Sequence, residues 1–467
     1  MAYDVVVLGS GPGGYVAAIR ASQLGLKTAI VEKESLGGVC LNWGCIPTKA
    51  LLKSAQVYEY IKHAGDYGIQ ASGNHQFDAV VKRSRGVADK MSKGVQFLMK
   101  KNKIDVVMGM GKLKGKGKLE VARPDGTKEI VEARHIIIAT GGRSRQLPSM
   151  PVDGKKIIGY REAMVLPQQP KSMIIVGSGA IGVEFAYFYN SMGTKVTIVE
   201  FMPRIVPVED EEISKELEKS YKKSGIEIMT GAEVTAVDTT GTGVKAKVKT
   251  ANGEVQLQAD VLLSAVGVSA NIEGIGLEET GVKTDKGKVV VDKFYQTSVP
   301  GIYGIGDCVP GQALAHVASK EGIICAESIA YKEKKYAHQP EPLDYGNVPG
   351  CTYCTPEIAS VGLTEKQARD QGYEVKVGKF PLSASGKASA AGHTEGFVKV
   401  IFDAKYGEWL GTHMIGYNVT EIIAQTVTAR KLETTYHEVL NSIHPHPTIS
   451  ESVKDAIEVA YGEAIHL

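Results

Sequence analysis

The chain has 467 residues, 43% of them hydrophobic and 23% charged, with a net charge of +2 from 54 basic and 52 acidic side chains. This length favours about three domains, and the balanced charge gives no electrostatic argument for nucleic-acid binding. No apolar run reaches the roughly 18 residues of a membrane span, and Tyr3–Leu8 already has the pattern of a strand, so we expect no signal peptide. Six cysteines in so long a chain are typical of a reducing compartment and predict a cytoplasmic location.

A dinucleotide-binding fingerprint opens the chain. The strand Tyr3–Leu8 runs into Gly9, Gly11 and Gly14, and a helix is expected to begin there. A second strand ends at Glu32, 23 residues after Gly9, which is close to the spacing expected of a ribose-binding acid. The pattern of strand, glycine turn, helix, strand and acid predicts a nucleotide pyrophosphate at the helix N-terminus.

Cys40 and Cys45 lie in the next segment, Gly37–Lys49, with four residues between them. A five-residue step on a regular helix rises roughly 7.5 Å, whereas a disulfide needs Cα atoms about 4.4–6.8 Å apart. A bridge therefore requires a local break in the helix, which Gly44 permits. A short strained loop of this kind favours a redox switch, and the alternatives are two unbridged buried cysteines or half of a metal site.

The fingerprint recurs in the middle of the chain. The strand Ser172–Val176 precedes Gly177, Gly179 and Gly182, and Glu200 again lies 23 residues after the first glycine. Two copies with matching strands, helices and acids are a far stronger signal than one. They predict two tandem Rossmann-like domains of the α/β class.

The remaining segments complete the predicted organisation. Residues 52–103 have a helical pattern with a break near Gly65–Gly73. Residues 104–132 predict a small antiparallel hairpin. The basic run Lys112–Lys118 within this hairpin is expected to be solvated. Residues 341–467 lack a fingerprint and predict an α+β domain with strands at 348–361, 374–381 and 396–402 and helices at 420–430 and 450–460. The expected boundaries are 1–148, 149–269, 270–340 and 341–467.

Further site candidates follow strands. Thr140, Gly141 and Gly142 end one apolar strand, where flexible backbone would lie beside a ligand. Asp307 follows another strand, at the sheet edge where α/β folds bind ligands, although it could also cap the next helix. Near the end of the chain, His446 and Glu451 suit an imidazole base oriented by a carboxylate; the alternative is an exposed loop histidine. His444 is interpreted as structural, and we predict no metal site.

Together these motifs resemble the flavin-dependent pyridine nucleotide–disulfide oxidoreductases, which include glutathione reductase, and in particular their dihydrolipoamide dehydrogenase branch. The resemblance covers essentially the whole chain and implies FAD on the first repeat, NAD on the second and a C-terminal dimerisation domain. Cys45 would face the flavin and Cys40 would exchange with protein-bound dihydrolipoamide. His446, oriented by Glu451, would be the base supplied by the other subunit of a homodimer.

The same resemblance implies a full set of binding residues and partners. The FAD-binding residues would be Gly9, Gly11, Gly14, Glu32, Lys49, Gly111, Thr140, Gly141, Gly142, Asp307 and Ala315, and the NAD-binding residues Gly177, Gly179, Gly182, Glu184, Glu200, Val234 and Gly267. Lys49 and Glu184 would form an ion pair beside the flavin. The partners would be lipoyl-bearing domains and the E2 core of a 2-oxoacid dehydrogenase complex, or a glycine cleavage system.

Rival functions differ in particular residues. An NADPH-dependent disulfide reductase would need arginine at the strand end where this chain has Glu200, and Arg204 is only a weak signal for NADP. A mercuric reductase would add a C-terminal cysteine pair, which the final residues 460–467 lack. A non-enzymatic flavoprotein sensor or scaffold is the rival from another class. One departure from the family pattern, Cys354 three residues after Cys351, is interpreted as packing.

Overall fold

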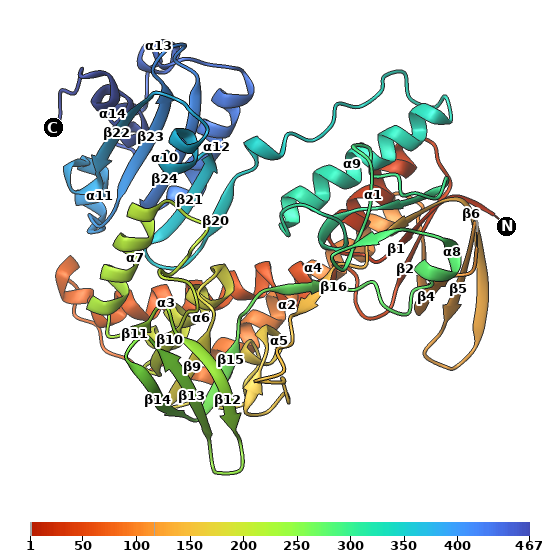
Figure 1. Cartoon of the computed structure of the whole chain (residues 1–467), viewed down its shortest axis with the longest axis horizontal. Helices are drawn as coiled ribbons and strands as arrows, with labels where there is room; N and C mark the ends of the chain where they lie inside the picture. Colours follow the sequence, from red (N-terminus) through yellow and green to blue (C-terminus); the bar gives the residue numbers. More distant parts are fainter. Residues whose placement is uncertain (1, 116) are drawn as a thin grey trace. The chain divides into compact units, whose positions relative to one another are not determined.

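The computed structural model describes residues 2–115 and 117–467, and the chain is organised in two compact units (Figure 1). The first unit consists of Met1–Leu51, Asp78–Arg145 and Gly267–Leu343. The second consists of Leu52–Phe77, Gln146–Val266 and Asp344–Leu467. Three crossings between the units lie near the predicted boundaries at 148, 269 and 340; the four-part division itself stays a prediction. Lys116, in the predicted basic hairpin, lies outside the described residues.

A seven-stranded sheet forms the centre of the first unit, in the order β3-β2-β1-β6-β5-β4, with β19 also paired to β6. Strands β1, β2, β3 and β19 pair in parallel, whereas β4, β5 and the first half of β6 pair antiparallel. The end of β6, Ile136–Ile138, is wholly buried, as expected of a parallel strand covered on both faces. The strands are β1 (Tyr3–Leu8), β2 (Thr28–Glu32), β3 (Asp105–Met108), β4 (Met110–Leu113), β5 (Lys118–Ala122), β6 (Lys128–Ile138) and β19 (Ile302–Gly304). Two small pairs, β7 (Gly142–Ser144) with β16 (Val268–Ala270) and β17 (Thr284–Asp285) with β18 (Lys288–Val289), also lie in this unit.

The predicted hairpin over residues 104–132 is wrong in its first part. Asp105–Met108 forms β3, which pairs in parallel with β2, and the antiparallel ladder starts only at Met110. Gly109 separates the two with φ 155°, and a Cβ there would lie 2.6 Å from the carbonyl oxygen of Ala122. Alternation identified strands correctly, but it does not reveal which distant strand each will pair with.

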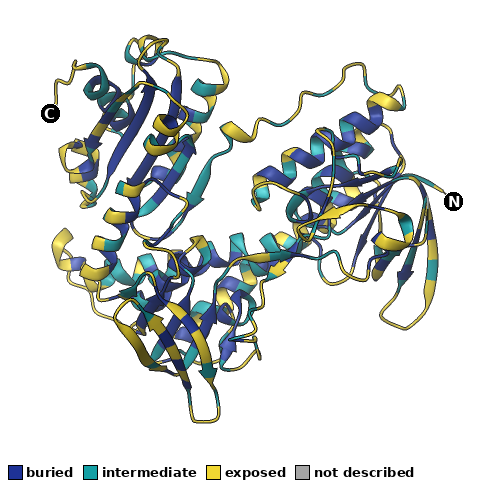
Figure 2. Ribbon diagram, viewed as in Figure 1, coloured by how far each residue is buried: buried dark blue, intermediate teal, exposed yellow. Residues whose placement is uncertain are grey.

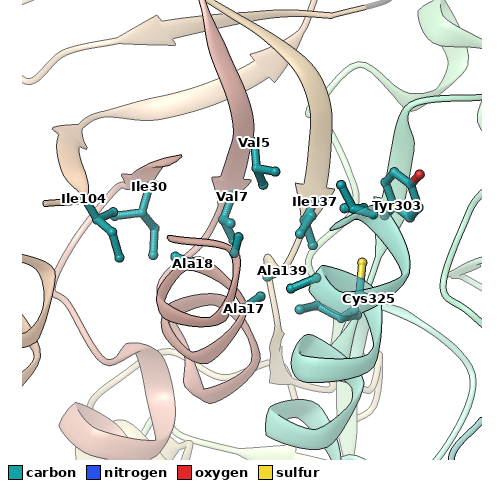
Figure 3. Close-up of a cluster of buried hydrophobic side chains, with 14 of the residues drawn as sticks. Val5, Val7, Ala17, Ala18, Ile30, Ile104, Ile137, Ala139, Tyr303 and Cys325 are labelled. Atoms are coloured by element: carbon teal, nitrogen blue, oxygen red, sulfur yellow. The ribbon is translucent and has the colours of Figure 1, made fainter. Parts of the chain in front are cut away.

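Helices α1 (Pro12–Gln23) and α9 (Ala315–Lys332) cover the side of this sheet on which Val5 and Val7 point (Figure 3). They approach closely, since a Cβ on Gly322 would lie 2.6 Å from the carbonyl oxygen of Gly13. The core between them includes the fully buried Cys325. Each buried aliphatic side chain in such a core contributes about 1.5–3 kcal/mol.

The described residues of the first unit contain five further helices or helical segments. They are α2 (Gly38–Trp43), α3 (Cys45–Lys62), which continues into the second unit, α4 (Phe77–Lys101), α8 (Leu277–Thr280) and the short 3-10 helix η2 (Gly306–Cys308). The predicted helical pattern over residues 52–103 and its break near Gly65–Gly73 are confirmed, because α3 ends at Lys62 and α4 begins at Phe77. In the part of the chain that the structure describes, no helix has both the length and the apolar character needed to cross a bilayer.

The second unit repeats the Rossmann arrangement. Its five-stranded sheet has the order β11-β10-β9-β15-β8 and is parallel throughout, and a three-stranded antiparallel sheet follows α7 in the chain. The strands are β8 (Ile157–Ile158), β9 (Ser172–Val176), β10 (Lys195–Val199), β11 (Glu227–Met229) and β15 (Val261–Ser264), then β12 (Glu233–Asp238), β13 (Val244–Thr250) and β14 (Gly253–Ala259). The helices are η1 (Ala64–Tyr67), α5 (Tyr160–Ala163), α6 (Ala180–Ser191) and α7 (Glu211–Lys223).

The C-terminal part of the second unit is an antiparallel sheet of order β20-β21-β24-β23-β22 with helices beside it. Its strand β24 was not predicted, because the polar Thr412 and His413 interrupt the apolar pattern, yet every residue of β23 and β24 is buried (Figure 2). The strands are β20 (Gly350–Thr352), β21 (Glu357–Gly362), β22 (Val375–Pro381), β23 (Phe397–Asp403) and β24 (Trp409–Gly416). The helices are η3 (Tyr345–Asn347), α10 (Glu365–Asp370), η4 (Leu382–Ala384), α11 (Gly386–Ala391), α12 (Val419–Lys431), α13 (Tyr436–Leu440) and α14 (Glu451–Tyr461).

Candidate active site

The first glycine turn is shaped by two different requirements. Gly9 has φ 104°, and a Cβ on it would lie 2.3 Å from the carbonyl oxygen of Ala139. A Cβ on Gly14 would lie 2.0 Å from the carbonyl oxygen of Gly9, so the chain itself requires glycine at both positions. Among the described residues, a Cβ on Gly11 would meet no atom within 4 Å. The glycine there leaves open space at the N-terminus of α1, where a pyrophosphate would approach the backbone.

The second turn repeats this geometry. Gly177 has φ 96°, and its Cβ would lie 2.5 Å from the carbonyl oxygen of Ala265, while a Cβ on Gly182 would lie 2.0 Å from the carbonyl oxygen of Gly177. Gly179, like Gly11, faces open space. Both predicted fingerprints therefore form turns with room for a ligand at the middle glycine.

Each acid holds its own glycine turn. Glu32 accepts hydrogen bonds from the Ser10 backbone at 3.0 Å and the Ser10 hydroxyl at 2.6 Å. Glu200 accepts the same two bonds from Ser178, at 2.7 and 2.6 Å. Sequence reasoning missed both serines, although the shared Gly-Ser-Gly of the two repeats was a usable signal. Each carboxylate thus orients its turn and retains acceptor capacity for a ribose.

Cys40 and Cys45 lie on either side of a helix break, as predicted. Helix α2 ends at Trp43, Gly44 leaves the helical conformation with φ −143° and ψ −117°, and α3 begins at Cys45. The start of α2 rests on the first glycine turn, because a Cβ on Gly38 would lie 2.6 Å from the Cα of Gly11.

Neighbouring groups fix α2 in this position. The backbone N–H of Gly37 donates to the carbonyl oxygen of Ser10 at 3.1 Å. The buried Asn42 amide donates to the carbonyl oxygen of Gly38 at 3.0 Å, and Arg85 donates to the carbonyl oxygen of Asn42 at 2.6 Å. The Arg85 guanidinium also lies 4.2 Å from the centre of the Trp43 ring. These contacts, which sequence reasoning also missed, connect the cysteine pair to the first turn.

The two sulfur atoms interact directly. Both cysteines are half-buried. The hydrogen bond with Cys45 and then burial raise the pKa of the Cys40 thiol far above its usual range, while the Lys49 ammonium acts to lower it. A proton shared between neighbouring sulfurs is the chemistry of a dithiol that can close to a disulfide.

The other predicted FAD residues lie in the first unit. Asp307 is in η2, after β19, and burial raises the pKa of its carboxyl. It does not cap α9, whose N-cap is Leu314, so that alternative is wrong. A Cβ on Gly142 would lie 3.5 Å from the Asp307 carboxylate, which places this acid beside the glycine-rich strand end. The fully buried Cys308 follows it.

The remaining predicted FAD residues have different surroundings: they are Gly111, Ala315 and the Thr140–Gly142 segment. A Cβ on Gly111 would lie 2.5 Å from Cδ1 of Leu8, so packing in the sheet already requires this glycine. Ala315 is the first residue of α9, and the carbonyl oxygen of Thr140 accepts a hydrogen bond from Asn271 at 3.1 Å. A cavity of about 640 Å³ lies just beyond Glu32 and is lined by Glu34, Ser35, Leu36, Ser92, Gln96, Met99, Lys100, Lys103, Ile104, Asp105, Val106 and Met108.

The predicted NAD residues outside the turn are dispersed. Glu184 lies on α6, is 5% exposed and accepts a hydrogen bond from the backbone of Tyr353 at 2.9 Å. Val234 lies on β12 and is packed in the core, and Gly267 has φ 102° in the first unit. Because Lys49 and Glu184 belong to different units, their ion pair stays a prediction.

His446 and Glu451 form the predicted pair. The Nδ1 atom of His446 lies 2.9 Å from Oε1 of Glu451, and the backbone N–H of Thr448 donates to Oε2 at 2.7 Å. Burial acts to raise the pKa of Glu451, but these two partners lower it below its usual value. An ionised Glu451 orients Nδ1–H toward itself and leaves Nε2 as the basic atom. The His446 side chain is 79% exposed in this chain.

Cys351 and Cys354 do not repeat the arrangement of the first pair. Cys354 is fully buried, and its thiol donates to the carbonyl oxygen of Pro356 at 3.1 Å. Burial raises the pKa of this thiol well above its usual range. These contacts support the interpretation of Cys354 as a packed core residue.

Comparison with known proteins decides the family. Residues 3–322 match the family described as pyridine nucleotide-disulphide oxidoreductase, and residues 348–457 match the dimerisation domain of that family. The chain belongs to this family. A dihydrolipoyl dehydrogenase of Rhizobium etli is 52% identical over 99% of both chains, and one of Zymomonas mobilis is 48% identical over 99% of both. The crystal structure of LpdA from Mycobacterium tuberculosis has a TM-score of 0.89 at 26% identity, covering 97% of this chain and 99% of that one.

Membership of the pyridine nucleotide-disulphide oxidoreductases confirms several predictions. The α/β class with two Rossmann-like repeats and a C-terminal dimerisation domain is correct, as is the assignment to the oxidoreductases. The match to the dimerisation domain supports a homodimer. The roles of individual site residues stay predictions.

Proposed function

We propose that this chain is a dihydrolipoyl dehydrogenase that oxidises protein-bound dihydrolipoamide to lipoamide with FAD and NAD+. The observation that carries this is the cysteine pair, placed on either side of the break at Gly44 and seated on the first glycine turn through Gly38. Relatives that are 52% and 48% identical over 99% of both chains have this name. A redox disulfide beside a dinucleotide site fits this chemistry.

The residues present fit both cofactors. The open space at Gly11, the acid Glu32 and the cavity beyond it would hold FAD, and the size of the cavity is that of a small-molecule site. Gly179 and Glu200 would hold NAD+ in the same way. When bound, FAD would take the electron pair of the dithiol and NAD+ would accept it as hydride.

The chain's own residues would perform the thiol chemistry. A substrate thiolate attacks the sulfur of Cys40 in the disulfide form, an S–S bond forms to substrate, and Cys45 leaves as a thiolate. The second substrate thiol then displaces Cys40, which closes the lipoamide ring and leaves the enzyme as the dithiol. Nε2 of His446 would accept the substrate thiol proton, while Glu451 holds the other ring nitrogen.

Glu200 supports NAD+ over NADP+. Its carboxylate lies at the end of β10, where a 2′-phosphate would meet a like charge. Arg204, the nearest candidate for a phosphate partner, is already bonded to the Glu211 carboxylate at 3.2 Å and the Pro207 carbonyl oxygen at 3.1 Å.

His446 would act on Cys40 of the other subunit of a homodimer. In its own chain the His446 side chain is 79% exposed, whereas a general base works best in a site that excludes water. Mixing His446→Ala subunits with Cys40→Ser subunits under exchange conditions would then create heterodimers with one intact site. About half of the activity should return per heterodimer; no return after exchange proven by native mass spectrometry would contradict the arrangement.

The wider setting follows from the same proposal. The substrate would be carried by lipoyl-bearing domains bound to the E2 core of a 2-oxoacid dehydrogenase complex, or by a glycine cleavage system. The cysteine usage supports a cytoplasmic location.

The test is anaerobic titration of the FAD-loaded protein with dihydrolipoamide while the flavin spectrum is recorded. We expect reduction by one equivalent of dithiol, followed by reoxidation with NAD+. Cys40→Ser should block reduction by the dithiol while leaving FAD bound. A wild-type spectrum that does not respond to dihydrolipoamide would refute the proposed substrate.

A further inference from the structure

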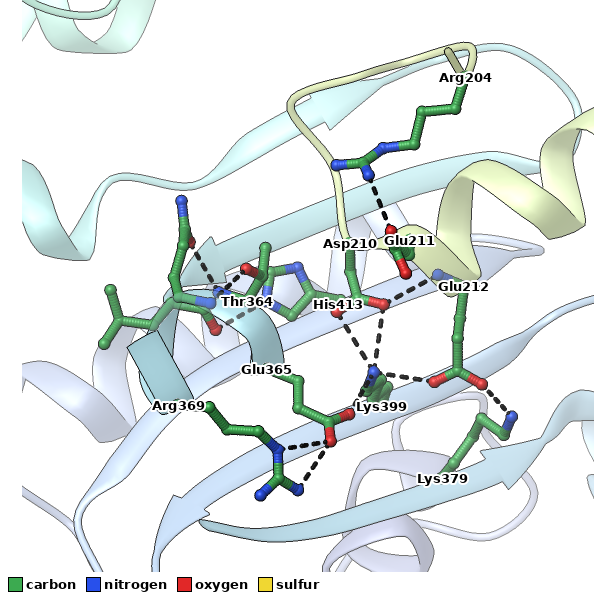
Figure 4. Close-up of polar contacts among 12 residues, drawn as sticks. Arg204, Asp210, Glu211, Glu212, Thr364, Glu365, Arg369, Lys379, Lys399 and His413 are labelled. Atoms are coloured by element: carbon green, nitrogen blue, oxygen red, sulfur yellow. Dashed lines mark hydrogen bonds and ion pairs between the residues drawn. The ribbon is translucent and has the colours of Figure 1, made fainter. Parts of the chain in front are cut away.

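A buried lysine of the C-terminal sheet contacts acidic side chains in the part of the sequence that follows Glu200. Lys399 lies on β23 and is 3% exposed. Its Nζ is 3.2 Å from Asp210, 2.8 Å from Glu212 and 2.9 Å from Glu365 (Figure 4). One ammonium group therefore holds carboxylates from the Rossmann repeat and from α10 of the C-terminal part.

The cluster keeps its charges. Burial alone would lower the pKa of Lys399, but hydrogen bonds to Glu212 and Glu365 and the charge of Asp210 raise it well above its usual range. The cross-strand neighbour His413 donates from Nε2 to a backbone carbonyl oxygen at 2.9 Å, and burial lowers its pKa, so it stays neutral. The lysine therefore remains a cation facing three carboxylates.

Asp210 connects this cluster to the NAD side of the repeat. It is 4% exposed and caps α7, accepting the backbone N–H of Glu212 at 3.0 Å. It also ends the return segment, residues 201–210, which leads from Glu200 to α7. At its start, this segment is held by the Met202 backbone N–H, which donates to Glu200 at 2.8 Å. The return segment is thus bonded to the ribose-binding acid at one end and, through Asp210, to Lys399 at the other.

The first repeat contains an equivalent segment, which is also hydrogen-bonded to its own glycine turn. In the first repeat, the backbone N–H of Gly37 donates to the carbonyl oxygen of Ser10 at 3.1 Å. In the second repeat, the backbone N–H of Val206 donates to the carbonyl oxygen of Ser178 at 3.2 Å. Both segments therefore return to the serine of their own glycine turn. Gly37 adopts φ 97° without strain, but Val206 adopts φ 39°. A β-branched residue in this left-handed region is strained and persists only when its surroundings hold it.

We propose that Lys399 is a positioning residue for NAD binding, which holds the return segment against the second glycine turn through Asp210. The inference rests on the proposed NAD site at Gly179 and Glu200. Its consequence is that a strand of the dimerisation domain determines how often the nucleotide turn is in its binding conformation. If loss of Lys399 leaves the return segment ordered in only about a tenth of the molecules, the apparent affinity for NAD+ falls about tenfold.

The experiment uses the full-length, FAD-loaded protein and four variants. Lys399→Met removes the cation, and Lys399→Arg keeps the charge. Asp210→Asn keeps a good helix cap but loses the ionic contact. Lys379→Met is the matched control, because Lys379 binds the same Glu212 from an exposed position, with 47% of its side chain accessible. Calorimetric titration with NAD+ and amide hydrogen exchange of residues 201–209 are measured for each, with flavin absorbance as a check on FAD content.

Lys399→Met should weaken NAD+ binding about tenfold and speed exchange in residues 201–209, while reduction of the flavin by dihydrolipoamide stays unchanged. In steady-state turnover, the fold increase in KM for NAD+ should exceed the fold decrease in kcat. Lys399→Arg should recover most of the affinity, and Lys379→Met should bind like wild type. If Lys399→Met fails to fold, Asp210→Asn carries the test, and it should show the same weakening.

Unchanged affinity and exchange in a folded Lys399→Met or Asp210→Asn protein would overturn the inference. Equal weakening by Lys379→Met would also overturn it, since the effect would then belong to any loss of positive charge. A wild-type protein that does not bind NAD+ would refute the proposed function instead, while hydrogen exchange of residues 201–209 would still decide whether Lys399 orders the segment.

Discussion

Replacing Gly179 by alanine should separate folding from nucleotide binding. Gly179 has φ −66° and ψ −179°, a conformation open to any residue, and a Cβ there meets no atom of the residues that the structure describes within 4 Å. An alanine at such a site reduces the freedom of the unfolded chain and stabilises the fold by about 0.4–1 kcal/mol. The same methyl group would occupy the space through which the pyrophosphate approaches the backbone.

The loss of binding can be estimated from the contacts that the methyl group prevents. A hydrogen bond to a charged group contributes about 1.5–3 kcal/mol, which corresponds to a weakening of NAD+ binding by about 10- to 150-fold. Gly182→Ala is the contrasting variant, since its Cβ would lie 2.0 Å from the carbonyl oxygen of Gly177. That clash should destabilise the second unit by about 1–3 kcal/mol.

Calorimetric titration with NAD+ and the thermal midpoint of each variant provide the assay. Gly179→Ala should bind weakly and melt no lower than wild type, whereas Gly182→Ala should melt lower. If Gly179→Ala binds NAD+ with wild-type affinity, the pyrophosphate does not approach this Cα, and the interpretation of the open space is wrong.

Three further outcomes are expected. Cys40→Ser should retain a charge-transfer absorbance between bound flavin and the Cys45 thiolate, and Cys45→Ser should lose it; the reverse result would exchange the two roles. Because of Glu200, kcat/KM should be much higher for NAD+ than for NADP+, and equal values would contradict that assignment. Since the folded-state pKa of Glu451 is lowered, its contribution to stability is present at neutral pH and disappears as the pH falls through that pKa. Glu451→Gln should therefore cost no more than about 1 kcal/mol at pH 7, with a smaller loss in acid, while activity falls about 100-fold or more because His446 loses its orientation. Thermal midpoints across pH and steady-state rates check this, and a stability loss independent of pH would contradict the ionic contact.

Local features of the fold were predictable because their causes are local. Gly14 is required by a contact with the carbonyl oxygen of Gly9 in the same turn, and the break at Gly44 follows from the geometry that the two neighbouring cysteines require. The pairing of β3 with β2 was not predictable in the same way, because alternation along a strand carries no information about its partner.

The supports of the candidate site were missed for a related reason. Arg85 reaches Asn42 from a helix 43 positions further along the chain, and Lys399 reaches Asp210 across 189 positions. Neither lysine nor arginine shows in the sequence that it will be buried or which carboxylate or carbonyl group it will meet. Catalytic residues with recognisable motifs are therefore easier to predict than the residues that position them.

Three of the cysteines, Cys308, Cys325 and Cys354, are fully buried, which should protect the chain from thiol scrambling. Burial raises the pKa of Cys308 to about 11 and raises those of Cys325 and Cys354 still further above their usual range. Because a thiol must both ionise and reach a disulfide before it can attack it, these three fully buried sulfurs should stay out of the exchange proposed for Cys40 and Cys45. Access, more than the number of cysteines, distinguishes the half-buried Cys40 and Cys45 from these three, so the chain can retain thiols in its cores without exposing them to the proposed exchange.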